Sequence, residues 1–123
     1  MSTISANDLQ NTSGGIPTVK GQRLIPTAWV NFNGTGTVAI RDSENVSSIT
    51  DIAVGKYDVN FSVALANSNY SVVGAAGYLA TDPSNASLAA WSSSTGAARI
   101  QVYTTANSPY DGPYVGVQVL GGQ

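Results

Sequence analysis

Seven acidic side chains are the first candidates for chemistry in this sequence of 123 residues. A glycosidase needs two carboxyl groups about 5–10 Å apart across a cleft. Asp42 and Glu44 lie two positions apart, a spacing that puts both on one face of a strand. Four other acids stand beside turn-forming residues, where Asp bonds to its own backbone: Asp51, Asp58, Asp82 and Asp111. The pattern favours solvated turn carboxylates over a catalytic pair.

Histidine and cysteine are both absent from the sequence. Without His no serine can form a Ser-His-Asp triad, and without Cys there is neither a thiolate nucleophile nor a disulfide. The acidic turn 82–85 is too short for a calcium loop, which ends in a bidentate acid. We therefore expect a protein that is not an enzyme and that holds no metal and no cofactor.

Aromatic residues in irregular segments are the binding candidates, because an aromatic face buries a large area with few rotatable bonds. The segments 77–97 and 106–113 are rich in turn-formers, and loops carry function more often than strands do. For Trp91 the alternative is packing in the core or between subunits. The predicted receptor-binding residues are Tyr78, Asp82, Asn85, Trp91, Tyr110 and Asp111, with Tyr103 and Tyr114 as further aromatic candidates.

The elements that would position these residues are strands. The chain has 13 Val and 7 Ile but only 6 Leu, and β-branched residues favour strands. Apolar residues alternate with polar ones from Tyr57 through Val63, and Val115, Val117 and Val119 share one face of the last segment. Six to eight short strands with frequent turn signals predict an all-β fold, an antiparallel β-sandwich.

Local signals place the strands. Asn33-Gly34 lies between two β-prone runs and predicts a hairpin, in which both residues would adopt positive φ. Trp29 and Phe32, on the strand before this turn, are expected in the core. The run 88–91 fits either a strand or a short helical turn.

Residues 1–27 differ from the rest, since they are polar at first and then carry short apolar pairs interrupted by Pro. We expect an extended N-terminal segment at 1–27 that attaches to a partner, and a β-sandwich domain at 28–123. The predicted attachment residues are Ile4, Leu9, Ile16 and Val19. No signal peptide and no membrane insertion are expected, because no apolar run approaches the roughly 20 residues of a membrane helix.

Charge is sparse, with 5 Lys and Arg against 7 Asp and Glu, and 10% charged residues overall. Scattered bases and a net charge of -2 argue against a nucleic-acid partner. A soluble surface carries about a quarter to a third charged residues. The low charge therefore predicts that part of the surface is buried between subunits, as in an obligate oligomer.

Several motifs carry a family resemblance. They are the segment 28–37 (AWVNFNGTGT), the residues 40–43 and 45–51, the strand 55–61 with Asn69-Tyr70 after it, and Pro113-Tyr114-Val115. This series resembles the C-terminal domain of many bacteriophage tail-fibre and receptor-binding proteins. Residues 1–4 and 13–15 resemble the start of short fibre proteins of cyanophages and related phages.

The resemblance implies a homotrimeric structural component of the virion, located on the phage tail and made in the host cytoplasm. It implies adsorption to a host-surface polysaccharide as the role, with residues 1–27 held by another virion protein. A capsid or tail decoration protein, which cements its neighbours and binds no receptor, is the alternative. Location on the virion would separate the two.

Overall fold

The computed structural model describes residues 2–3, 5–10, 12–14, 17–19, 22–23, 25–77 and 86–123, which form strands and loops without any helix. Its strands are β1 Thr18–Val19, β2 Gln22–Arg23, β3 Ala28–Asn33, β4 Ala39–Glu44, β5 Val46–Ala53, β6 Lys56–Phe61, β7 Tyr70–Gly77, β8 Ala86–Ser92, β9 Ala97–Thr104 and β10 Tyr114–Gly121. The all-β prediction is confirmed.

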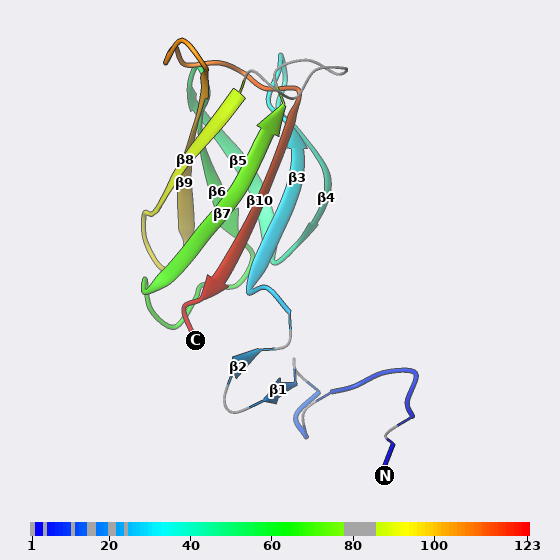
Figure 1. Ribbon diagram of the computed structural model, residues 1–123. Helices are drawn as coiled ribbons and strands as arrows, with labels where there is room; N and C mark the ends of the chain where they lie inside the picture. Colours follow the sequence, from blue (N-terminus) through cyan, green and yellow to red (C-terminus); the bar gives the residue numbers. More distant parts are fainter. Residues whose placement is uncertain are drawn as a thin grey trace.

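Two four-stranded sheets pack face to face (Figure 1). The first has the order β4-β3-β10-β7 and the second the order β5-β6-β9-β8, and all neighbouring strands are antiparallel. The short β1-β2 ladder lies outside both sheets. The sandwich architecture is thus confirmed, and the last strand, β10, joins β3 to β7 across the first sheet.

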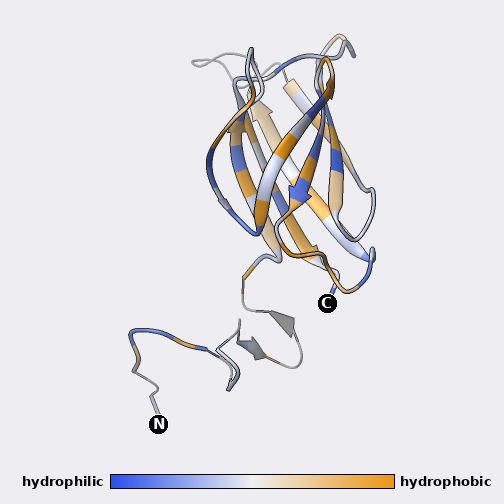
Figure 2. Cartoon of the chain, turned by 180° about the vertical axis from the view of Figure 1, so that it is seen from behind, coloured by the Kyte–Doolittle hydropathy of each residue, from blue (hydrophilic) through white to orange (hydrophobic). Residues whose placement is uncertain are grey.

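The core lies between the sheets and follows the period-2 pattern of the strands. Tyr57, Val59 and Phe61 of β6 are buried, as are Val115, Val117 and Val119 of β10. Figure 2 shows hydrophobic and hydrophilic positions alternating along the strands. The Phe32 ring meets the Tyr57 ring edge to face, with the centroids 5.2 Å apart. Each fully buried side chain of this size contributes about 1.5–3 kcal/mol.

The β3–β4 hairpin forms, but its turn differs from the predicted two-residue type. Neither Asn33 nor Gly34 has a positive φ, and five residues, 34–38, separate the two strands. The Asn33 Oδ1 accepts hydrogen bonds from the Thr35 backbone N–H at 3.0 Å and from its hydroxyl at 2.7 Å. The Gly34 N–H donates to the Gly112 carbonyl oxygen at 2.8 Å. Contacts with a distant loop thus override the local turn preference.

Three further details refine the expected strands. The alternation that begins at Tyr57 stops at Phe61, because Val63 lies beyond the end of β6 and is 70% exposed. The segment 88–91 belongs to a strand, β8, and not to a helical turn. Thr27, just before β3, is buried, and its backbone N–H donates to the Val119 carbonyl oxygen at 2.8 Å. The chain is therefore already fixed to the sandwich one residue before the predicted domain boundary.

The connections between the strands lie at two opposite ends of the sandwich (Figure 1). We call the end with the loops 34–38, 54–55 and 105–113 the loop end. The Gly34 N–H donates to the Gly112 carbonyl oxygen and the Gly55 N–H to the Asp111 carboxylate, so these loops bond to one another. The N-terminal end is where Thr27 enters and where the connections 62–69 and 93–96 meet, with the Leu65 N–H donating to the Thr95 carbonyl oxygen. No helix in the described part of the chain is long and apolar enough to span a membrane.

Candidate functional site

The predicted receptor-binding residues do not converge on one place. Tyr78, Asp82 and Asn85 lie outside the described residues. Trp91 pairs with Arg99 on the second sheet, near the N-terminal end of the sandwich. Tyr110 belongs to the loop end, where its N–H donates to the Val102 carbonyl oxygen. Among the described candidates, only Tyr110 and Asp111 are neighbours.

Trp91 lies on the outer face of the second sheet and is 46% exposed, so it is not a core residue of this chain. Its neighbour Arg99 is held by Asp58 through two hydrogen bonds of 2.7 and 2.8 Å. This carboxylate raises the pKa of Arg99 above its ordinary value. Trp91 thus stands beside an ion pair on an exposed surface of the sheet.

Asp111 is engaged within the fold. Its Oδ1 accepts hydrogen bonds from the Gly55 backbone N–H at 2.7 Å and from the Tyr57 hydroxyl at 2.9 Å. The Tyr57 hydroxyl also lies 3.0 Å from the Gly34 carbonyl oxygen, a second acceptor for its proton. Burial raises the pKa of Tyr57 above its ordinary value, and Asp111 raises it further. Asp111 therefore ties its own loop to the segment that leads from Gly55 into β6.

Of the predicted attachment residues, too, only some are among the residues that the structure describes. Ile4 and Ile16 lie outside the described residues, while Leu9 and Val19 are 56% and 57% exposed. Val19 belongs to the β1-β2 ladder, opposite Gln22. Both described residues present apolar side chains to the surroundings, as an attachment segment would, but their partner stays a prediction.

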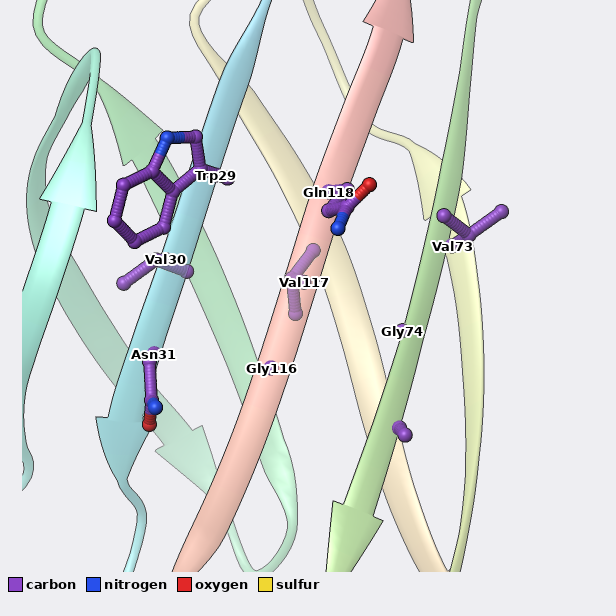
Figure 3. A pocket seen from close by; sticks show the side chains of 9 residues that line it. Trp29, Val30, Asn31, Val73, Gly74, Gly116, Val117 and Gln118 are labelled. Carbon is purple, nitrogen blue, oxygen red and sulfur yellow. The ribbon is translucent and has the colours of Figure 1, made fainter. Parts of the chain in front are cut away.

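A groove in the outer face of the first sheet is the candidate site that combines aromatic and polar side chains (Figure 3). It has a volume of about 580 Å³. Strands β3, β10 and β7 form its floor and sides, and we call it the sheet groove. Its lining residues are Trp29, Val30, Asn31, Val73, Gly74, Ala75, Gly116, Val117 and Gln118.

The strand register explains the hollow. Gly116 on β10 stands between Asn31 on β3 and Ala75 on β7, and it has no side chain to fill the space above them. A Cβ added at Gly116 would meet no atom within 4 Å. One row further along, Gln118 stands between Trp29 and Val73. A small residue in the middle of larger neighbours thus produces a depression on a rigid sheet.

Trp29 corrects the expectation that it belongs to the core. Strand β3 buries Ala28, Val30 and Phe32, so Trp29 and Asn31 point to the opposite, outer face. In Figure 3 the indole is seen broadside, with its flat face turned toward the viewer looking onto the sheet. Within the described part of the chain, no hydrogen bond engages the Trp29 indole N–H or the Gln118 amide. Both groups are available to a ligand.

A second aromatic residue, Tyr114, lies on the same sheet at the loop end and is 45% exposed. The Arg41 guanidinium stacks on its ring, 4.4 Å from the centroid. Arg41 also donates to the Pro113 carbonyl oxygen at 2.6 Å and to the Asn31 Oδ1 at 3.3 Å. Arg41 therefore covers one face of Tyr114, and Trp29 is the aromatic side chain that lines the groove.

Asp42 and Glu44 lie beside the groove on the edge strand β4. The register places Asp42 opposite Asn31 and Glu44 opposite Trp29, so both carboxylates share the outer face, as their spacing predicted. Both are exposed. The Asp42 Oδ1 accepts a hydrogen bond from the Ser43 N–H at 2.9 Å. Within the described residues, no three His, Cys, Asp or Glu side chains group closely enough to hold a metal ion.

The sequence contained a signal for this site. In the segment 114–120 the three buried valines alternate with Tyr114, Gly116, Gln118 and Leu120, which point outward. A glycine therefore stands in an outward row. The alternation of β3 likewise puts Trp29 outward once Phe32 is inward. Neither pattern reveals that β10 lies between β3 and β7, and that arrangement is what assembles the groove.

Comparison with known proteins adds no relative. No family model matches the chain, and no curated protein and no solved structure matches it. The resemblance to phage tail-fibre domains therefore stays a prediction that depends on the motifs of this sequence.

Proposed function

We propose that this chain is a non-enzymatic carbohydrate-binding module, and that it acts in a phage tail fibre that adsorbs to host-surface glycan. The observation that carries the proposal is the half-buried indole of Trp29 beside the Gln118 amide, both lining the groove over Gly116. The phage setting is supported by the sequence motifs alone.

The chemistry of the sheet groove suits a sugar ring. An aromatic face packs against the apolar C–H surface of a sugar, since it offers a large and rigid contact area. A side-chain amide supplies both donors and acceptors, which matches sugar hydroxyl groups. Because Trp29, Asn31 and Gln118 are held on neighbouring strands, little conformational entropy is lost on binding.

The proposal extends to assembly. We propose a homotrimer, because a chain with only 10% charged residues gains by burying surface between copies. Three copies would present three grooves, which raises avidity for a repeating polysaccharide. Residues 1–27 would bind another virion protein, a role supported by the exposed side chains of Leu9 and Val19.

The same exposed residues of the N-terminal segment favour a second candidate, a capsid or tail decoration protein that binds no receptor. Electron microscopy of virions with the chain labelled separates the candidates. Label at the tail tip supports the tail-fibre proposal. Label on the capsid lattice supports the decoration protein and contradicts the tail-fibre role.

A glycan array probed with the purified full chain tests sugar binding directly. We expect the wild-type protein to bind a subset of bacterial-surface glycans. Trp29→Ala should weaken that binding about fivefold or more, because a lost stacking contact is worth about 1 kcal/mol or more. Trp91→Ala is the matched control, since it removes the other tryptophan from the opposite sheet.

A second variant addresses the groove without touching the indole. Gly116→Val fills open space and should abolish binding while the chain stays folded. Wild-type protein that binds no glycan contradicts the proposal. It is also overturned if Trp29→Ala or Gly116→Val lowers the solution mass, because the groove would then be a contact between subunits.

A further inference from the structure

We infer that the sheet groove selects uncharged sugars and discriminates against sugars that carry a carboxylate. This inference rests on the proposed function and names the substrate class of that site. Its basis is the distribution of charge on the outer face of the first sheet, which the strand register determines.

Two carboxylates border the indole platform. Glu44 stands directly opposite Trp29, and Asp42 directly opposite Asn31, in the antiparallel pair of β3 and β4. Residues paired in this way have Cβ atoms about 4.5–5.5 Å apart. A sugar stacked on Trp29 therefore lies within roughly one Debye length, about 8 Å, of both acids.

The first sheet has little positive charge to balance them. In strands β3, β4, β7 and β10 the charged residues are Arg41, Asp42 and Glu44, so one base faces two acids. Arg41 is already engaged by the Tyr114 ring, the Pro113 carbonyl oxygen and the Asn31 Oδ1, at the loop end of the groove. The ion pair of Arg99 and Asp58 belongs to the other sheet.

The polar groups inside the groove are neutral. Asn31 and Gln118 carry amides, which bond sugar hydroxyl groups without a preference for charge. A carboxylate on the ligand would meet no cation among the lining residues, since Arg41 at the loop end is already engaged, and it would approach Glu44 and Asp42. Like charges about 7 Å apart in water weaken binding roughly threefold each, and more where the dielectric is lower. Rejection by repulsion is a common source of specificity.

Two pairs of oligosaccharides with matched ring stereochemistry test the inference. The full chain is titrated with galactotriose and trigalacturonate, and with cellotriose and a triglucuronate of the same linkage, while the dissociation constants are measured at low salt. In whichever pair shows binding, we expect the neutral sugar to bind about tenfold more tightly than the acidic sugar. Raising the salt to about 1 M should shrink this ratio, since the Debye length falls to about 3 Å.

Charge-neutralising variants assign the effect to the two acids. The double variant Asp42→Asn with Glu44→Gln should strengthen binding of the acidic sugar severalfold and leave the neutral sugar unchanged. Asp51→Asn is the control, because it removes an exposed charge from the second sheet. Equal or tighter binding of the acidic sugar by wild type overturns the inference and leaves the proposed function intact. Absence of binding to both pairs and to every glycan of the array contradicts sugar binding itself.

Discussion

The hydroxyl of Tyr57 donates a hydrogen bond to the Asp111 carboxylate at 2.9 Å, and this bond links a strand of the second sheet to a connection at the loop end. The Tyr57 side chain is fully buried and comes from β6, while Asp111 comes from the connection that leads into β10. The same oxygen of Asp111 accepts the Gly55 N–H at 2.7 Å. One carboxylate thus fixes the loop end of the sandwich.

Removing that carboxylate should destabilise the fold. Asp111→Ala leaves the Tyr57 hydroxyl and the Gly55 N–H without this acceptor, and we expect the free energy of unfolding to fall by about 1–3 kcal/mol. Urea unfolding followed by circular dichroism measures the change. Asp42→Ala, at an exposed strand position, should change it by less than about 0.5 kcal/mol. Equal effects of the two substitutions would contradict a structural role for Asp111.

Alkaline pH should destabilise the protein through its buried phenols. The pKa of Tyr57 is raised above its ordinary value of 10.0 by burial and by Asp111, and burial also raises the pKa of Tyr70. Above pH 10 the unfolded chain loses these protons while the folded chain keeps them, so stability is complete below pH 10 and falls as the pH rises. Stability measured between pH 8 and about pH 11 should fall less steeply in Tyr57→Phe than in wild type. If stability fell equally steeply with pH in Tyr57→Phe and in wild type, Tyr57 would not be the source of the alkaline destabilisation.

Substitution by alanine should have opposite effects on stability at two glycines. Gly55 has φ +68, and a Cβ there would lie 2.6 Å from the Val102 carbonyl oxygen, so Gly55→Ala combines backbone strain with a clash. We expect a loss of at least about 2 kcal/mol in thermal or urea unfolding. At Gly116 a Cβ meets nothing within 4 Å, and Gly116→Ala should be neutral or slightly stabilising. Comparable losses at both positions would contradict this account of the two sites.

Self-association can be measured by light scattering during size exclusion. A chain with 10% charged residues and exposed apolar side chains outside the groove, such as Ile52 and Val54, should elute as a trimer, with three times its mass of 12.6 kDa. A mass of one chain that persists at high protein concentration would contradict the trimer.

The strands could be predicted from sequence because their information is local. The alternation of Tyr57, Val59 and Phe61 requires only that one face of a strand be buried. The turn at Asn33-Gly34 could not be predicted in detail. Gly34 bonds to Gly112, which is distant in sequence, and that contact decides the course of the loop.

The candidate site was harder to predict because it depends on which strands are neighbours. Trp29 and Gln118 are 89 positions apart in sequence and become partners only through the β3–β10 pairing. Aromatic residues in the segments expected to be irregular could be identified locally, but Trp91 belongs to strand β8, apart from Tyr110, and Asp111 is used within the fold. Aromatic residues in loops were too general a signal to locate a groove.

Fluorescence of the two tryptophans can distinguish the two outer faces of the sandwich. Trp91 is 46% exposed, whereas Trp29 is half-buried beside the groove, so acrylamide should quench the variant Trp29→Phe more strongly than Trp91→Phe. A sugar bound in the groove should then protect Trp29 from acrylamide and leave Trp91 unaffected, since only Trp29 lines the groove. Protection of Trp91 alone would move the binding site to the second sheet, beside Arg99 and Asp58.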